Sequence, residues 1–192
     1  NLDGLSLPKV VLVKHSFDAF NYSKIINHAL DHAKGDCICL LNDDLEFINP
    51  FWLQDMIRWL HHKDTGIVGA LLMYPDRKVQ HAGITMGING PCDHAERGFY
   101  GTGSNKISHL TKHPRSVSAV TGACLLAARS TFDQLGGLEE KFAEAYNDVD
   151  FCLRAKDIGH NVVMSPRSKI YHHESVNVGS PLSDERLRTF QK

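Results

Sequence analysis

The sequence lacks the compositional features of several protein classes. Its 192 residues carry 21 Lys and Arg against 22 Asp and Glu, a net charge of −1, so no broad basic surface for nucleic acid is expected. No apolar run approaches the ~20 residues that a membrane-spanning helix needs, and the first residues show no signal-peptide pattern. Length and a hydrophobic content of 42% instead predict one globular domain over residues 1–192.

The cysteines are too few and too scattered to form a disulfide framework or a zinc site. They are odd in number, and most stand inside apolar patterns: Cys37, Cys39, Cys92, Cys124 and Cys152. No tight Cys/His ligand spacing occurs, which argues against a histidine-rich zinc protein. The pattern is typical of reduced, buried thiols in a cytoplasmic protein.

Apolar periodicity predicts an α/β fold in the first half of the chain. A first strand over 9–13, a helix over 22–34 stopped by Gly35, and a second strand make a unit that predicts parallel pairing. The second strand, Ile38 to Leu41, is apolar throughout, as in a strand buried on both faces. Next we expect a helix over 51–61 that begins at Asn49-Pro50, and strands over 66–73 and 79–86.

The second half begins with a segment that has no periodicity. Residues 87–113 predict a long loop, of the kind that is often functional. The later elements are an apolar stretch over 116–129 interrupted by Thr121-Gly122, a helix capped by Ser130 and ending at Gly136-Gly137, a helix over 148–158 capped by Asn147, two short strands around Pro166, and a loose tail over 180–192.

Asn42-Asp43-Asp44 is the first group of residues that indicates chemistry. It follows the buried strand directly, and ligands in α/β proteins bind where such strands end. Adjacent carboxylates there suit a hard divalent cation that holds a phosphate. A turn or a helix N-cap is the commoner explanation of such a cluster taken alone.

Two further groups could complete a site. Asp148 and Asp150 open the predicted helix, where they complement its dipole and where one of them could act as a general base. His172 and His173 are adjacent in a strand, so at most one can join a given metal centre. Gln80-His81-Ala82-Gly83 is explained equally well by a hairpin strand with one exposed histidine.

The joint order of these motifs resembles the family 2 glycosyltransferases with the GT-A fold, particularly the bacterial rhamnosyltransferase-like and polysaccharide-synthesis members. The resemblance covers nearly the whole chain and rests on these motifs, in order: Phe20-Asn-Tyr-Ser, Leu-Asn-Asp-Asp, His-Ala-Gly, Thr-Gly-Ala-Cys-Leu-Leu, Leu-Gly-Gly-Leu-Glu-Glu-Lys-Phe, Asn-Asp-Val-Asp-Phe-Cys-Leu-Arg and Tyr-His-His-Glu-Ser. It implies a three-layer α/β fold with a mixed, mainly parallel sheet.

The resemblance also implies an activity: inverting transfer of a sugar from a nucleotide-diphosphate donor to a hydroxyl of a saccharide or lipid-linked acceptor. Asp44 and His172 would hold Mn²⁺ or Mg²⁺, with His173 as the alternative ligand, and Asp148 would be the general base. The donor would lie near Asn42 and Asp43. The acceptor side would include Thr121, Gly122 and Asp150.

Family members begin with a strand–helix–strand unit that holds the nucleotide, and this chain starts near the third strand. We therefore expect a fragment of a longer glycosyltransferase, with little activity alone, which could associate peripherally with a membrane through its other parts. The alternatives are a non-catalytic GT-A module and a sugar nucleotidyltransferase. The latter needs a glycine-rich, basic phosphate loop near its start, and this sequence has none there.

Overall fold

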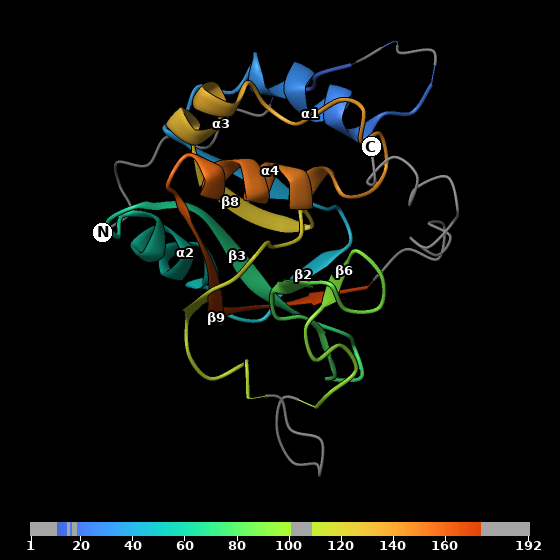
Figure 1. The fold of residues 1–192 in the computed structure, drawn as a ribbon, viewed down its shortest axis with the longest axis vertical. Coiled ribbons are helices and arrows are strands. Elements are labelled where there is room, and N and C mark those ends of the chain that lie inside the picture. Colours follow the sequence, from blue (N-terminus) through green and yellow to red (C-terminus); the bar gives the residue numbers. More distant parts are fainter. Residues whose placement is uncertain (1–10, 15, 17–18, 101–108, 174–192) are drawn as a thin grey trace.

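The computed structural model describes residues 11–14, 16, 19–100 and 109–173 (Figure 1). Its helices and strands follow in this order: α1 (Tyr22–Leu30), β1 (Cys37–Leu41), β2 (Leu45–Phe47), α2 (Trp52–Leu60), β3 (Thr65–Met73), β4 (Val79–His81), β5 (Ile84–Met86), β6 (Cys92–His94), β7 (Arg115–Ser116), β8 (Cys124–Ala128), α3 (Arg129–Leu135), α4 (Asn147–Asp157) and β9 (Asn161–His172).

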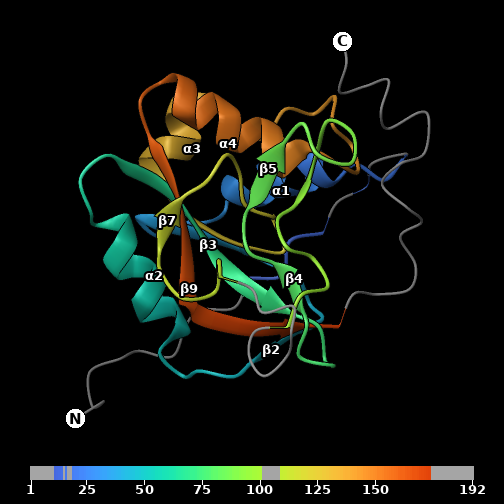
Figure 2. The same cartoon turned by 60° about the horizontal axis from the view of Figure 1, so that its bottom comes forward.

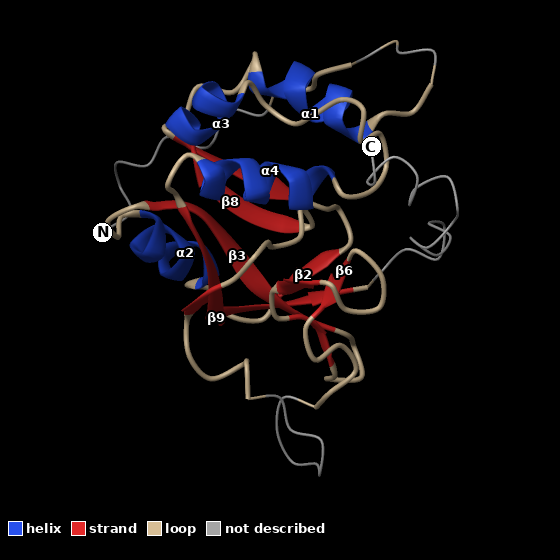
Figure 3. Ribbon diagram, viewed as in Figure 1, coloured by secondary structure: helices blue, strands red, loops and turns tan. Residues whose placement is uncertain are grey.

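The predicted three layers are confirmed. The central sheet carries α2 on one face and α1, α3 and α4 on the other (Figure 3). Successive side chains of a strand point to opposite faces, so neighbouring residues enter different cores. Ile67 and Leu125 pack in the cluster that includes residues of α3 and α4, whereas Val68 and Leu126 pack against α2. The two cores hold the helices to both faces of the sheet.

The sheet is mixed, as predicted, but it is not mainly parallel. Its strand order is β1-β8-β3-β9-β2, with β4 paired to β3 and β7 paired to β9. Within the described strands β3 and β9 pair in parallel, and the other pairings are antiparallel. β8 lies between β1 and β3 and runs opposite to both, which replaces an expected parallel contact with two antiparallel ones.

Two predictions for the start of the sheet are wrong: a strand over 9–13, of which residues 11–13 are described, and its parallel pairing with the strand over 38–41. Residues 11–13 do not form a strand, and Leu12 is 81% exposed. β1 pairs with β8 in antiparallel register, Leu41 opposite Cys124. Leu41 is 46% exposed, so β1 is not buried on both faces.

All four helices differ from their predictions at one end or more; α2, for example, begins at Trp52 after the N-cap Phe51 and not at Asn49-Pro50. α1 ends at Leu30, because residues 31–34 are exposed and Ala33, the one apolar residue among them, is not buried against the core. α3 is capped by Ala128 and not by Ser130, since β8 runs directly into it. α4 is capped by Tyr146, at φ 63°, and not by Asn147. Gly136 ends α3 in a left-handed conformation, as predicted.

The predicted strand over 79–86 is divided into β4 and β5 by Gly83, whose φ is +98°. The prediction of one long loop over 87–113 is corrected at Cys92–His94, which form β6 and pair with β5. Figure 2 shows this hairpin beside α4. Residues 101–108 of that segment and the predicted tail over 180–192 lie outside the described residues.

The two strands predicted around Pro166 form one strand, β9, whose register against β3 shifts between Ala70 and Leu71. Of the helices in the described ranges, none is long and apolar enough to cross a membrane.

Candidate active site

Asp44 and His172 are brought together by the pairing of two strands. β2 pairs with the end of β9 so that Leu45 lies opposite His172, and the backbone N–H of His173 donates to the Asp44 carbonyl at 3.1 Å. This register places Asp44 Oδ1 3.0 Å from His172 Nε2. Both side chains are mostly buried, with exposures of 18% and 13%.

Asn42 and Gln80 contact the His172 ring from two sides. Asn42 Nδ2 lies 3.4 Å from His172 Nε2, and Gln80 Oε1 lies 2.6 Å from His172 Nδ1. Asn42 is fixed in turn by its backbone N–H, which donates to the Ala123 carbonyl at 3.0 Å. His172 is therefore held in one orientation.

The neighbouring candidates Asp43 and His173 lie apart from the pair formed by Asp44 and His172. Asp43 is exposed. His173 points elsewhere, with its Nε2 3.2 Å from Glu46 Oε2 on the surface. The adjacent histidines do point to different sides, and His172 is the one beside Asp44.

Asp148 stands at the N-terminal end of α4, where the helix dipole favours a negative charge. Its Oδ2 accepts a hydrogen bond from the Gly122 backbone N–H, and its Oδ1 accepts one from the Val149 N–H, both at 2.8 Å. A Cβ on Gly122 would lie 3.6 Å from both Asp148 Cβ and the Tyr22 hydroxyl. The three groups thus pack closely around the carboxylate.

Tyr22 is a site residue that sequence reasoning missed. Burial, and secondarily the negative charge of Asp148, raise the pKa of Tyr22 to about 12, so the phenol stays protonated at neutral pH. Its only sequence signal is the Phe20-Asn-Tyr-Ser segment, in which the apolar period places the tyrosine at the start of a helix.

A cleft of about 440 Å³ joins these groups. It is lined by Phe20, Tyr22, Asn42, Thr121, Gly122, Ala123, Glu144, Asn147, Asp148 and His172. The cleft therefore brings together five of the residues predicted from the sequence, and Asp44 adjoins it through His172.

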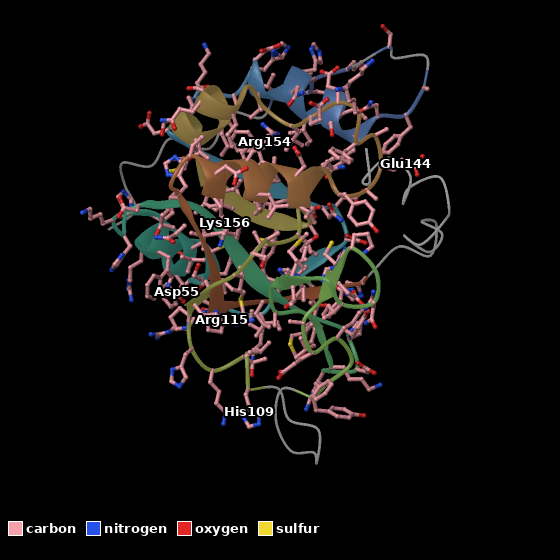
Figure 4. The ribbon with its side chains drawn as sticks, in the orientation of Figure 1. Asp55, His109, Arg115, Glu144, Arg154 and Lys156 are labelled. Carbon is pink, nitrogen blue, oxygen red and sulfur yellow. The ribbon has the colours of Figure 1, made fainter. Side chains whose placement is uncertain are left out.

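A second pocket, of about 290 Å³, shares the Asp148 wall. Its other walls come from the β5–β6 hairpin and the start of α4, including Ile84, Asp93 and Val149. Glu144 lines both pockets, and its side chain is seen near the end of α4 where Asp148 lies (Figure 4). Asp148 therefore lies between the two pockets.

Asp150 does not line the cleft; its side chain contacts Arg154 of the same helix. Its Oδ2 accepts from Arg154 Nε at 2.7 Å, and Arg154 also donates to the carbonyls of Leu135 and Gly137. Arg154 accordingly appears between α3 and α4 in Figure 4. The ion pair lies within α4, and the two carbonyl hydrogen bonds of Arg154 tie that helix to the end of α3.

His81 is fully buried and not exposed as the hairpin interpretation expected. Its Nδ1 lies 2.9 Å from His94 Nδ1, and its Nε2 accepts from the Thr121 N–H at 3.4 Å. Burial first, and then the nearby His94, Arg115 and His172, hold the pKa of His81 well below its usual value. A neutral histidine thus supports the turn that contains Thr121 and Gly122.

Asp44 and His172 fit a divalent cation whose remaining ligands come from elsewhere. Two ligands at right angles around an octahedral ion, each about 2.1 Å away, lie roughly 3.0 Å apart. Across the described residues, no cluster of three or more His, Cys, Asp or Glu side chains forms a complete metal site. A cation that keeps only one or two protein ligands and takes the rest from phosphate oxygens and water is typical of Mg²⁺ sites.

Residues 4–123 match the model of glycosyl transferase family 2. The chain is 38% identical over 174 residues to an uncharacterized protein, y4gI, of Sinorhizobium fredii, and 36% identical over 171 residues to the O-antigen biosynthesis protein RfbC of Myxococcus xanthus. The alignments include 90% and 86% of this chain but only 19% and 13% of those proteins, so the chain spans less than a fifth of their length.

Two solved structures share the fold at low sequence identity. A mannosyltransferase from Pyrobaculum calidifontis, in complex with GDP-Man and Mn²⁺, matches with a TM-score of 0.53 and 15% identity, over 81% of this chain and 37% of its own. GalNAc-T7 with UDP, GalNAc and Mn²⁺ matches with a TM-score of 0.65 and 13% identity, over 88% and 34%. The predicted GT-A fold is confirmed, and the chain belongs to glycosyltransferase family 2.

Proposed function

We propose that this chain carries the metal-binding residues and the general base of an inverting glycosyltransferase. Such an enzyme moves a sugar from a nucleotide-diphosphate donor to a saccharide hydroxyl. The observation that carries the proposal is the shared cleft: His172, next to Asp44, and Asp148 line the same space of about 440 Å³. Transfer of this kind requires a positive centre at the leaving group and a base at the attacking hydroxyl, and both sets of groups face this cleft.

Asp44 and His172 would hold Mn²⁺ or Mg²⁺. When bound, such a cation neutralises the charge that develops on the leaving diphosphate. Asn42, which contacts His172, lies where the donor would enter, and we assign Asp43 to the exposed rim of that side. The Mn²⁺ and nucleotides present in the two structures of similar fold support a cation of this type.

Asp148 would take the proton from the acceptor hydroxyl as that hydroxyl attacks the anomeric carbon. Each carboxylate oxygen accepts one backbone N–H, which fixes the group's orientation and leaves further lone pairs for the acceptor. The second pocket, on the other side of Asp148, would admit the acceptor, with Thr121 and Gly122 at the boundary. Attack from the side opposite the leaving group in a single displacement gives inversion.

Asp150 has a different role in this proposal from the one that the family resemblance implied. Its carboxylate is engaged by Arg154 and is absent from both pocket linings, so we assign it to the support of α4 and not to acceptor binding.

The test is a transfer assay with a panel of nucleotide-diphosphate sugars, Mn²⁺ or Mg²⁺, and saccharide and lipid-linked acceptors. It should be run on the 192-residue chain and on the complete gene product. The similarity to an O-antigen biosynthesis protein makes cell-surface saccharides the first acceptors to try. We expect cation-dependent transfer whose product has the opposite anomeric configuration to the donor, read by NMR. Retention, or no transfer by a folded complete gene product, would overturn the proposal, and the latter would favour a non-catalytic module.

A further inference from the structure

We propose that Gln80 is a positioning residue that fixes the tautomer of His172 and so keeps Nε2 of that ring available to a cation. This inference rests on the metal site of the proposed function. It adds to that site a residue of β4 that contacts neither substrate nor cation.

The contact on the Nδ1 side assigns the proton. Gln80 is 4% exposed, and its Oε1 lies 2.6 Å from His172 Nδ1. A carboxamide oxygen can only accept, so the hydrogen stands on Nδ1. The other end of the amide, Gln80 Nε2, donates to the His172 backbone carbonyl at 3.5 Å, which orients the amide with its oxygen toward the ring.

The contact on the Nε2 side agrees with this assignment. Asn42 Nδ2, which can only donate, lies 3.4 Å from His172 Nε2. Hydrogen on Nδ1 and an N–H donor beside Nε2 fit the Nδ1–H tautomer, in which Nε2 carries the lone pair. That lone pair and Asp44 Oδ1 face each other across 3.0 Å. Two electron-pair donors at this separation suit adjacent ligand positions around one cation.

The alternative tautomer would close the site. A proton on Nε2 would be donated to Asp44 Oδ1 at this 3.0 Å separation, and the resulting hydrogen bond would occupy both cation ligands at once. Gln80 disfavours that state, because it would set the bare Nδ1 lone pair against the Gln80 oxygen.

The sheet itself places Gln80 at this position. β4 pairs with β3 through Leu72 and His81, and β3 pairs with β9 through Met73 and Tyr171. Both β4 and β9 therefore pair with the same stretch of β3. Loss of a residue that hydrogen-bonds to a metal-ligating histidine typically weakens metal binding by roughly 10- to 100-fold.

Three variants test the proposal by Mn²⁺ titration of the chain, followed by the electron paramagnetic resonance signal of the free ion. We expect Gln80→Leu to weaken Mn²⁺ binding by roughly 10- to 100-fold, because nothing then accepts from Nδ1. Gln80→Glu retains the acceptor and should bind nearly as the wild type does. Gln134→Leu removes an exposed Gln–His contact of 3.3 Å to His160, and since neither residue lines the cleft it should leave binding unchanged.

A second measurement reads the tautomer of His172 directly. Two-bond ¹⁵N–¹H spectra of the histidine-labelled, metal-free chain report which ring nitrogen carries hydrogen. We expect the Nδ1–H tautomer for His172 in the wild type and a shift to Nε2–H in Gln80→Leu. A purely structural role for Gln80 would lower stability without changing the tautomer.

The outcomes separate the two proposals. Wild-type Mn²⁺ binding together with an Nε2–H ring, or with unchanged binding in Gln80→Leu, would overturn the role of Gln80 alone. A folded wild-type chain and complete gene product that bind no Mn²⁺ would overturn the metal site of the proposed function, and with it the purpose assigned to Gln80.

Discussion

Replacement of Asp148 by Asn is the change for which the structure gives the most detailed expectation. The amide has the same shape as the carboxylate, but it cannot act as the base. General base catalysis typically contributes about 10²- to 10⁴-fold, so kcat in the complete gene product should fall by about that factor. Donor and Mn²⁺ binding should be nearly unchanged, since Asp44 and His172 are untouched.

The same substitution carries a cost in stability that the assay must separate from catalysis. Asp148 accepts from the Gly122 and Val149 backbone N–H groups, both at 2.8 Å, and the amide can accept only one of them. Loss of one hydrogen bond to a charged acceptor is worth about 1.5–3 kcal/mol. The free energy of unfolding, measured with urea, should decrease by about that amount. Turnover should be compared under conditions where both proteins remain fully folded.

Asp157→Asn is the matched control. It makes the same change of charge in the same helix, at an exposed position near the C-terminal end of α4. We expect unchanged kcat and unchanged or slightly raised stability, since a negative charge there opposes the helix dipole. A spectroscopic titration adds a check of local geometry, because removal of the Asp148 charge should lower the pKa of Tyr22 from about 12. An Asp148→Asn protein with turnover within tenfold of the wild type would refute the base assignment.

Three other changes test the surrounding structure. In Gly69→Ala the new Cβ would lie 2.4 Å from Val120 Cβ, so urea unfolding should show a loss of about 1–3 kcal/mol, and equal stability would contradict this packing. Folded His81 has a pKa well below its usual value, so it stays neutral where an unfolded histidine binds a proton. The free energy of unfolding should therefore fall as pH drops below about 6.5, by up to roughly 1.4 kcal/mol per pH unit, a slope that His81→Gln should reduce. His172→Ala should abolish Mn²⁺ binding measured by titration calorimetry, whereas His173→Ala, which alters an exposed side chain, should not.

Local patterns were sufficient to predict the residues at which strands and helices meet the cleft. The apolar run that ends in Asn42 gave the end of β1, and the helical period after Asp148 placed that carboxylate at the start of α4. These predictions depend on neighbouring residues alone. Strand direction does not, and the insertion of β8 between β1 and β3 could not be inferred from the sequence of any one of them.

The choice between His172 and His173 required tertiary information for the same reason. Alternation in a strand shows that the two point to opposite faces, but not which face meets Asp44. The register of β2 against β9, with Leu45 opposite His172, decides it. The contact of Gln80 with His172 and the approach of Tyr22 to Asp148 likewise join segments 92 and more than 100 residues apart.

The expectation that this chain is a fragment with little activity alone remains a prediction. The relatives from Sinorhizobium fredii and Myxococcus xanthus are several times longer than the region that aligns with it. Parallel assays of the 192-residue chain and the complete gene product will test it. Equal kcat and equal donor affinity in the two proteins would contradict it.

Anomalous diffraction from crystals grown with Mn²⁺ and either UDP or GDP would locate the cation relative to Asp44 and His172. We predict an anomalous peak between Asp44 Oδ1 and His172 Nε2, within roughly 2.0–2.3 Å of each atom, with diphosphate oxygens completing its coordination. Asp148 should face the same bound group across the cleft without touching the ion. A well-ordered diphosphate whose Mn²⁺ is coordinated by other side chains, with Asp44 and His172 in contact only with each other, would refute the assignment of these two residues as metal ligands.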